Sequence, residues 1–324
     1  MNSILSRTVR KNRKPGGLTT SQTMREVIFA LVPIVIFASI YFGAHVLLVC
    51  FLSMATAVLS ELFWSLVTQK TAKVSDFSSA VTGLMCALVM PASAAWYIPV
   101  FSSCFAVIVM KLFFGGFGKN ILNPALASRA LMMFVFAISM REFSVDAITI
   151  ATPLVHIEQG EFAMVPGYLS MFLGVIPGCI GETSKLLILL SGIYLSIRGV
   201  IDFRIPVSML VFAFLTALVL QGPSGALYQL LSGGLFFAAV FAATDPVTSA
   251  KGPVLSWIYG ALCGMLVILF RMYLPLFTGG VTPAVLLMNL LFALIQRGIP
   301  YLKKKTAPRD LPASEETVDI ERPE

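Results

Sequence analysis

The chain has 324 residues and a formal net charge of +7, and 57% of its residues are hydrophobic while only 12% are charged. A soluble domain carries about 25% charged residues, so this composition excludes an ordinary soluble fold and indicates that lipid covers the surplus apolar side chains. The basic residues stand at the ends of apolar runs, without the basic and aromatic stripe that binds nucleic acid. They are therefore expected to set membrane topology.

Ten apolar segments follow a basic N-terminal segment, residues 1–25, and together form a membrane domain over about 26–296. We expect helices at about 26–43, 45–68, 77–91, 96–114 and 123–140, and then at about 183–198, 205–221, 228–244, 254–271 and 282–296. Residues 77–91 are fewer than the roughly 20 that a spanning helix needs, which predicts a broken or re-entrant helix. The charged tail, residues 297–324, is expected to be solvated.

The distribution of positive charge orients these segments. With the N-terminus in the cytoplasm, most lysines and arginines outside the apolar runs lie on the cytoplasmic side of a bacterial inner membrane. This rule predicts that both termini are cytoplasmic and that the mixed stretch 141–181 lies on the outer face.

Five segments on each side of that stretch would form two inverted repeats. TGLMCALVMP (82–91) and GGLFFAAVFAATDP (233–246) fall at related places in the two halves. Paired, interrupted segments of this kind mark the central site of inverted-repeat membrane proteins; chance similarity of apolar sequence is the alternative. The predicted fold class is an all-α polytopic membrane protein with about ten transmembrane helices, some of them broken or re-entrant.

Three short stretches are too polar for plain lipid-facing helix. In the first, GGFGKNILNPA (115–125), glycines such as Gly118 allow a tight turn before Asn120, and Asn123 is expected to cap a helix that starts with the next proline. Arg129 then lies just inside the membrane, where a charge needs a partner and is a functional candidate. A plain turn, with the arginine reaching to the interface, is the alternative.

The second stretch is DAITIATPL (146–154), which is rich in hydroxyl groups. Pro153 biases Thr152 toward extended geometry, which projects its side chain clear of any helix. An ordinary outer loop is the alternative interpretation of these residues.

The third stretch is ATDPVTS (243–249), where Asp245 directly follows an apolar run. An Asp-Pro pair with flanking hydroxyls can build a helix break lined by oxygen atoms, which suits a cation or a polar ring. A simple helix stop is the alternative. A similar cap signal that contains Glu182 leads into the sixth segment. No metal site is expected, because none of the five cysteines has CxxC spacing (Cys50, Cys86, Cys104, Cys179, Cys263).

Four sequences, in this order along the chain, together resemble the RnfD membrane subunits of the Rnf ion-translocating electron-transport complexes: GGFGKNILNPALASR, DAITIATPL, IPGCIGETS and FAATDPVTSAKGP. The hydropathy pattern resembles that family from about residue 24 to 297, and NqrB subunits of sodium-pumping quinone reductases share the same core. In this family a threonine matching Thr152 carries flavin mononucleotide (FMN) through a phosphoester bond. The flavin transferase recognises an aspartate six residues upstream, which matches Asp146. Thr149 and Ile150 stand where the family usually has serine and glycine.

The resemblance implies a subunit of a complex that moves electrons between ferredoxin and NAD, coupled to Na⁺ or H⁺ transport. It implies covalent FMN on Thr152, a second, non-covalent flavin (riboflavin), and other membrane, flavin and iron–sulfur subunits as partners. The candidates for shaping the flavin sites are Asp146, Thr149, Pro153, Gly118, Asn120, Asn123, Arg129 and Glu182. Asp245 and Glu61 are the acids to test for ion coupling. We expect no catalytic side chain in this subunit, because the cofactor supplies the chemistry.

Two other functions remain open at this point. An NqrB-type subunit working with quinone usually has a longer N-terminal extension than this chain shows. A channel or facilitator for a small solute would suit inverted repeats equally well, but it has no use for the motif from Asp146 to Thr152.

Overall fold

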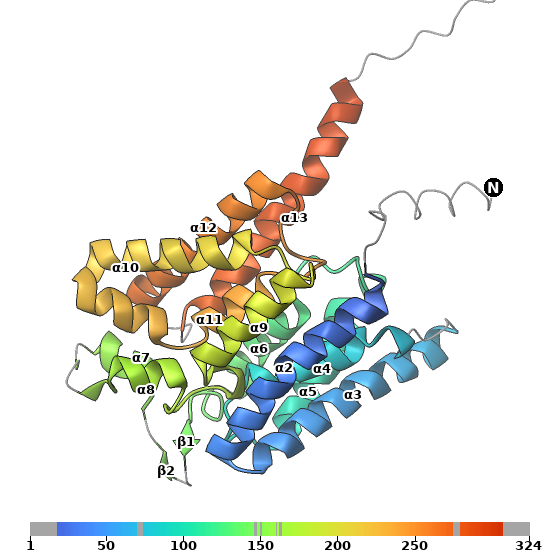
Figure 1. Cartoon of the computed structure of the whole chain (residues 1–324). Coiled ribbons are helices and arrows are strands. Elements are labelled where there is room, and N and C mark those ends of the chain that lie inside the picture. Colours follow the sequence, from blue (N-terminus) through green and yellow to red (C-terminus); the bar gives the residue numbers. More distant parts are fainter. Residues whose placement is uncertain are drawn as a thin grey trace, which may run out of the picture.

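The computed structural model describes residues 18–69, 74–145, 148–149, 151–159, 161, 164–274 and 279–306. Within these residues the regular structure is helical except for a short antiparallel hairpin of β1 (Ser144–Val145) and β2 (Ile148–Thr149). The prediction of an all-α polytopic membrane protein is confirmed (Figure 1).

The first five predicted segments are all helical. They form α2 (Thr20–Phe42), α3 (His45–Thr68), α4 (Ser78–Leu88), α5 (Tyr97–Val107) with its π-helical continuation η2 (Ile108–Leu112), and α6 (Pro124–Val135). A short 3-10 turn, η1 (Val74–Asp76), precedes α4. A capping box starts α2, because Thr19 accepts a hydrogen bond from the Gln22 amide and Gln22 accepts one in return. As predicted, α4 has only 11 residues and cannot span a membrane alone.

The stretch between the two halves contains three short elements. These are α7 (Pro153–Glu158), α8 (Tyr168–Leu173) and the 3-10 turn η4 (Ile180–Glu182). An isolated antiparallel bridge between Pro91 and Cys179 joins the residue before η4 to the end of the α4 segment. The connecting stretch is therefore tied into the membrane domain.

The second half also has five helical segments. They form α9 (Lys185–Ile197), α10 (Arg204–Leu231), α11 (Leu235–Phe237) with its π-helical continuation η5 (Ala238–Ala242), α12 (Pro253–Tyr273) and α13 (Val281–Thr306). The sequence predicted one helix over about 228–244, and this boundary is wrong. Gly222 takes a left-handed φ of 75°, Pro223 follows it, and the chain then continues as α10 to Leu231. The eighth segment is therefore only the half-helix α11–η5.

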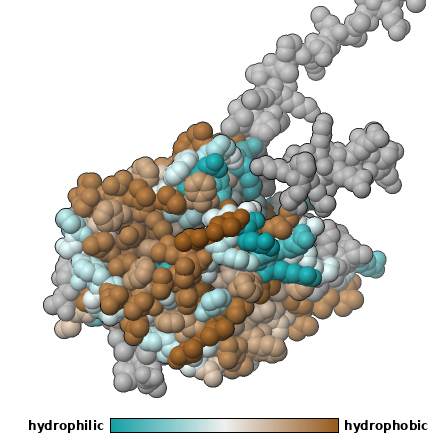
Figure 2. All heavy atoms as spheres, viewed as in Figure 1, coloured by the Kyte–Doolittle hydropathy of each residue, from teal (hydrophilic) through white to brown (hydrophobic). Residues whose placement is uncertain are grey.

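Four helices are long and apolar enough to cross a membrane (α2, α3, α10 and α12), and shorter apolar helices stand beside them. Large apolar side chains point away from the protein; Ile40 is 80% exposed and Val219 84% exposed. Figure 2 shows hydrophobic residues over most of one face. Lipid is the solvent that such a surface requires, so the chain is a multi-pass membrane protein.

Small residues let the long helices of the second half pack closely. Gly260 and Gly264 lie one helical turn apart on α12, facing α10. A side chain at Gly264 would collide with the Met209 carbonyl. Close backbone approach through small residues is the usual way that membrane helices associate.

Candidate functional site

Two cavities lie at opposite ends of two half-helices, α4 and α11–η5. The Asp245 cavity has a volume of about 80 Å³, and its polar lining groups are Ser78, Thr82, Lys111, Asn120, Asn123, Thr244 and Asp245. The Thr152 cavity has a volume of about 160 Å³, and its polar and charged lining groups are Arg129, Arg141, Thr152, Glu182, Lys185 and Thr282. The residues singled out in the sequence thus fall largely into two separate sites.

The two half-helices run between these cavities in opposite directions. The helix α4 starts at Ser78 in the Asp245 cavity and ends at Leu88 in the Thr152 cavity. The half-helix α11–η5 starts beside Gly234 in the Thr152 cavity and leads to Asp245 in the other. This antiparallel pair is the arrangement that inverted repeats with interrupted segments predict.

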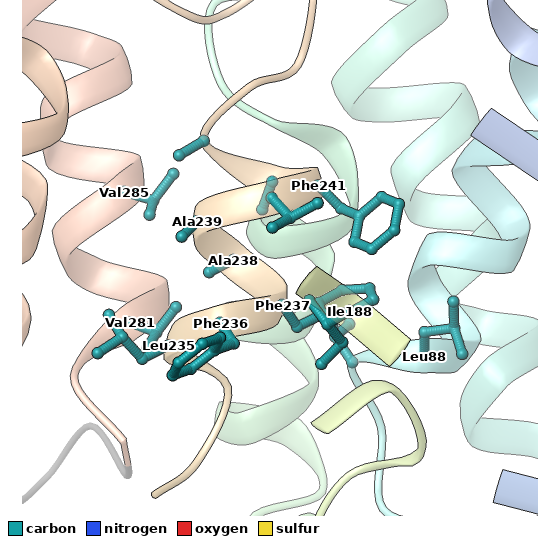
Figure 3. Packing of buried hydrophobic residues seen from close by; sticks show 14 of the residues in the cluster. Leu88, Ile188, Leu235, Phe236, Phe237, Ala238, Ala239, Phe241, Val281 and Val285 are labelled. Atoms are coloured by element: carbon teal, nitrogen blue, oxygen red, sulfur yellow. The ribbon is translucent and has the colours of Figure 1, made fainter. Parts of the chain in front are cut away.

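A wall of apolar side chains separates the two cavities. Phe237 faces the Thr152 cavity and Phe241 the Asp245 cavity, with ring centroids 5.2 Å apart. Figure 3 shows both rings on α11–η5, with Leu88 and Ile188 beside them. Gly181 closes the contact, because a Cβ there would lie 2.9 Å from both the Leu88 carbonyl and the Phe237 ring.

Thr152 sits at the mouth of the larger cavity, immediately before α7. Its backbone is extended (φ −73°, ψ 155°), as Pro153 predicts, and its side chain does not cap the helix. The hydroxyl is therefore not committed to the local backbone. Three basic side chains and one carboxylate line the cavity beside it, which makes the site attractive to an anion.

Arg129 joins three segments at this cavity. Its Nη1 donates to the Val89 carbonyl at 2.6 Å, to Cys179 Sγ at 3.4 Å and to Glu182 Oε1 at 3.4 Å. Its Nε is buried and has no hydrogen-bond partner among the described residues. The partner that was expected for this partly buried charge is thus Glu182, and the buried Nε remains available as a donor to a bound group.

Lys185 is a site residue that the sequence analysis missed. Its side chain is completely buried, lines the Thr152 cavity, and donates from Nζ to the carbonyls of Glu182 at 2.7 Å and Thr183 at 3.2 Å. In the sequence, Lys185 stands at the first turn of an apolar helix, where it looks like an ordinary lysine at the membrane interface.

The Asp245 cavity is organised by Asn123. As predicted, its Oδ1 caps α6 by accepting from the amides of Ala125 and Leu126 at 3.0 and 3.2 Å. Its Nδ2 donates to the Ala242 carbonyl at 3.2 Å and lies 3.5 Å from Asp245 Oδ2. Asn123, which caps a helix in the first half of the protein, therefore also binds the end of α11–η5 in the second half.

These motifs and their order recur in known proteins. Residues 14–304 match the profile of the family described as NQR2, RnfD, RnfE. The chain belongs to the NQR2, RnfD, RnfE family. The resemblance to RnfD subunits seen in the sequence is confirmed.

Three relatives within this family show its range. In Acetobacterium woodii, the subunit designated D of the Na(+)-translocating ferredoxin:NAD(+) oxidoreductase complex is 35% identical and covers 89% of this chain and 93% of its own length. In Clostridium ljungdahlii, the subunit designated D of the proton-translocating ferredoxin:NAD(+) oxidoreductase complex is 33% identical and covers 86% and 90%. In Chromohalobacter salexigens, the subunit designated B of the Na(+)-translocating NADH-quinone reductase is 33% identical and covers 73% and 63%.

The two acids chosen for ion coupling have different surroundings in this family member. Glu61 is buried on α3, where Lys111 Nζ lies 3.6 Å away and the Ser79 hydroxyl donates to it. Lys111 also donates to Ser78 Oγ at 2.7 Å and Ser79 Oγ at 2.8 Å. Asp245 forms no ion pair within the part of the chain that the structure describes. The structure thus places Glu61 in a closed network and leaves Asp245 open to a cavity.

The remaining predicted site residues take simpler places. Gly118 makes the turn before α6 with a φ of 92° but lines neither cavity. Pro153 lines the Thr152 cavity as the first residue of α7, and Thr149 belongs to β2. Asp146 and Ile150 lie outside the described residues.

Proposed function

We propose that this chain is the flavin-carrying membrane subunit of an Rnf-type ferredoxin:NAD oxidoreductase that couples electron transfer to Na⁺ or H⁺ transport. The observation that carries the proposal is that Thr152, in the sequence ATPL (151–154), lines a cavity that also contains three basic side chains. This cavity lies at one end of the membrane domain. The relatives named as ferredoxin:NAD(+) oxidoreductase subunits align with 89% and 86% of this chain, whereas the quinone reductase relative aligns with 73%. This difference favours the Rnf type.

Residues at the Thr152 cavity fit a covalent FMN. A phosphoester on the Thr152 hydroxyl would lie among Arg129, Arg141 and Lys185, which suits a phosphodiester charge. Apolar groups such as Leu126 and Phe237 offer a surface for a flat ring, and the unpartnered Arg129 Nε offers a donor. When bound, FMN supplies one- and two-electron transfer, and the chain supplies position and electrostatics.

The polar lining of the Asp245 cavity suits the polar edge of a flavin without a phosphate, which we assign to riboflavin. Its polar edge consists of the amide of Asn123 with Thr244 and Asp245, groups that hydrogen-bond a neutral polar ring. Lys111, the basic side chain of this lining, is already bound to Ser78, Ser79 and Glu61. A phosphate would therefore find no available cation there among the described lining residues.

The covalent flavin has a direct test. We expect the full-length chain, co-expressed with a flavin transferase, to give a fluorescent band on a denaturing gel, and Thr152→Ala to abolish that fluorescence completely. Thr183→Ala is a matched control, because Thr183 is buried beside Glu182 but is not the attachment residue. A fluorescent band that persists in Thr152→Ala, or is absent in the natural chain, contradicts the proposal.

Ion coupling is tested separately at the carboxylate of Asp245. In vesicles that contain the complete complex, Asp245→Asn is expected to lower cation uptake per electron transferred several-fold, because the amide keeps the size of the side chain but removes its charge. Cation uptake is compared with NADH formation in the same vesicles, so that a general loss of electron transfer is separated from a loss of coupling. An unchanged ratio removes Asp245 from the ion path.

Partners and orientation follow from the same proposal. The chain would receive electrons at Thr152 on the outer face from a neighbouring flavin subunit, with both termini in the cytoplasm of a bacterial inner membrane. Other membrane and iron–sulfur subunits of the complex would complete the path, and lipid would cover the exposed apolar helices.

A further inference from the structure

A third cavity, which neither flavin proposal uses, adjoins the Asp245 cavity. We call it the Gln296 cavity; it has a volume of about 240 Å³ and is lined by Asn120, Ile121, Val247, Thr248, Ser249, Phe292, Ala293 and Gln296. Asn120 and Val247 line the Asp245 cavity as well, so the two spaces share a wall.

Two buried polar atoms in this lining lack hydrogen-bond partners within the described part of the chain. They are Asn120 Oδ1 and Gln296 Nε2, and the Thr248 hydroxyl beside them donates to the Asp245 carboxylate. Asn120 is 5% exposed and Thr248 6% exposed, so bulk water does not solvate them. Buried polar atoms without partners cost free energy, and these two belong to one lining without bonding to one another. A small polar guest between them removes that cost.

The chemistry of the lining selects the kind of guest. The side chains offer neutral oxygen atoms from an amide and from the hydroxyls of Thr248 and Ser249. The amide oxygen and nitrogen of Gln296 are interchangeable by a flip, which adds a further oxygen. The lining residues include no carboxylate, thiol or imidazole. Neutral oxygen ligands suit a hard, singly charged cation better than a transition metal or a divalent ion.

The Asp245 carboxylate supplies negative charge on the other side of the wall that the two cavities share. Asp245 Oδ1 accepts a hydrogen bond from the Val247 amide at 2.8 Å, and the Asp245 carboxylate accepts one from the Thr248 hydroxyl, whose oxygen lone pairs remain available to a cation. The basic group that acts on this carboxylate, Lys251, is exposed and donates to the Pro246 carbonyl. The carboxylate thus attracts a cation into the cavity without lining it. Broken helices at membrane depth commonly bind cations through such unwound segments.

We propose that the Gln296 cavity is a binding site for a monovalent cation such as Na⁺, held by oxygen atoms of Asn120, Thr248 and Gln296 next to Asp245. The interpretation of this cavity as a binding site on the path of the transported ion rests on the proposed function. It does not depend on either flavin being bound.

Equilibrium binding of ²²Na⁺ to the full-length chain, purified in detergent, tests the proposal without any electron donor. We expect saturable binding that Thr248→Val and Gln296→Leu each weaken by about tenfold or more, because each variant removes one ligand to a charged guest. Thr216→Val is the matched control: it also removes a threonine hydroxyl from the membrane domain, but that hydroxyl bonds to Phe212 within α10. Its sodium affinity is expected to equal that of the natural chain.

Three results overturn the proposal. These are no saturable ²²Na⁺ binding to the natural chain, binding that both cavity variants retain unchanged, and equal weakening in Thr216→Val. Thermal unfolding of each variant in choline chloride shows whether it is folded, and a variant that has lost its cooperative transition is replaced by Thr248→Ala or Gln296→Met. Thr152→Ala, tested in parallel, separates the two proposals, because loss of its flavin leaves sodium binding unchanged.

Discussion

Lys111→Met is expected to destabilise the protein by about 3–5 kcal/mol, because it leaves the Glu61 carboxylate buried without a counter-charge. The side chains of Lys111 and Glu61 are 3% and 7% exposed, so water cannot replace the missing ammonium group. The variant also removes hydrogen bonds to Ser78 and Ser79, which start α4. Denaturant titration in detergent, with tryptophan fluorescence as the signal, measures the loss.

The double variant Lys111→Met/Glu61→Gln provides the control for that result. It removes both charges together, so most of the lost stability is expected to return, because a buried pair is worth little compared with the cost of one buried charge left alone. A double variant as unstable as Lys111→Met alone would show that the hydrogen bonds to the serines, and not the charge balance, explain the loss.

Arg129→Met is expected to have an effect of similar size, about 3–5 kcal/mol, and to act on the flavin site as well. The variant leaves Glu182, whose side chain is only 13% exposed, without its partner, and it removes the 2.6 Å hydrogen bond from Arg129 on α6 to the Val89 carbonyl. Val89 follows the last residue of α4 and lines the Thr152 cavity. The variant therefore removes a hydrogen bond that holds this part of the cavity wall to α6. Denaturant titration measures stability, and the fluorescence of the denatured band measures flavin attachment.

Arg141→Gln is the matched control for Arg129→Met. Arg141 also lines the Thr152 cavity, but it is exposed at the surface. Surface substitutions usually change stability by less than about 0.5 kcal/mol. If both variants lose the same stability, the partly buried Arg129–Glu182 pair is not the reason for the loss.

The sequence predicted the helical segments and several capping residues because these features are local. Apolar runs, the Asn123 cap and the extended Thr152 each depend on neighbours within a few positions. The boundary error at 228–244 has a local cause too: Gly222 with Pro223 interrupts an apolar run, and periodicity does not show which side of the break a helix joins.

The long-range part of the site was beyond prediction. The contact of Asn123 with Asn289, where the Asn123 amide donates to Asn289 Oδ1 at 3.1 Å, joins residues 166 positions apart. Asn289 itself is the one polar residue of the apolar run 283–295, so nothing in its surroundings along the chain marks it as a contact of Asn123. The pairing of Glu61 with Lys111 and the burial of Lys185 likewise depend on how helices assemble, which no pattern within one segment encodes.

The antiparallel course of α4 and α11–η5 has an electrical consequence. Each cavity receives the carbonyl end of one half-helix and the amide end of the other, so the two helix dipoles nearly cancel at both places. The dipoles of these two half-helices therefore do little to distinguish the two cavities, whereas side-chain charge does. Three basic groups against one carboxylate make the Thr152 end positive, while Asp245, without an ion pair among the described residues, contributes negative charge at the other end. The scaffold is thus polarised across its thickness, so that an electron is more stable at one end and a cation at the other.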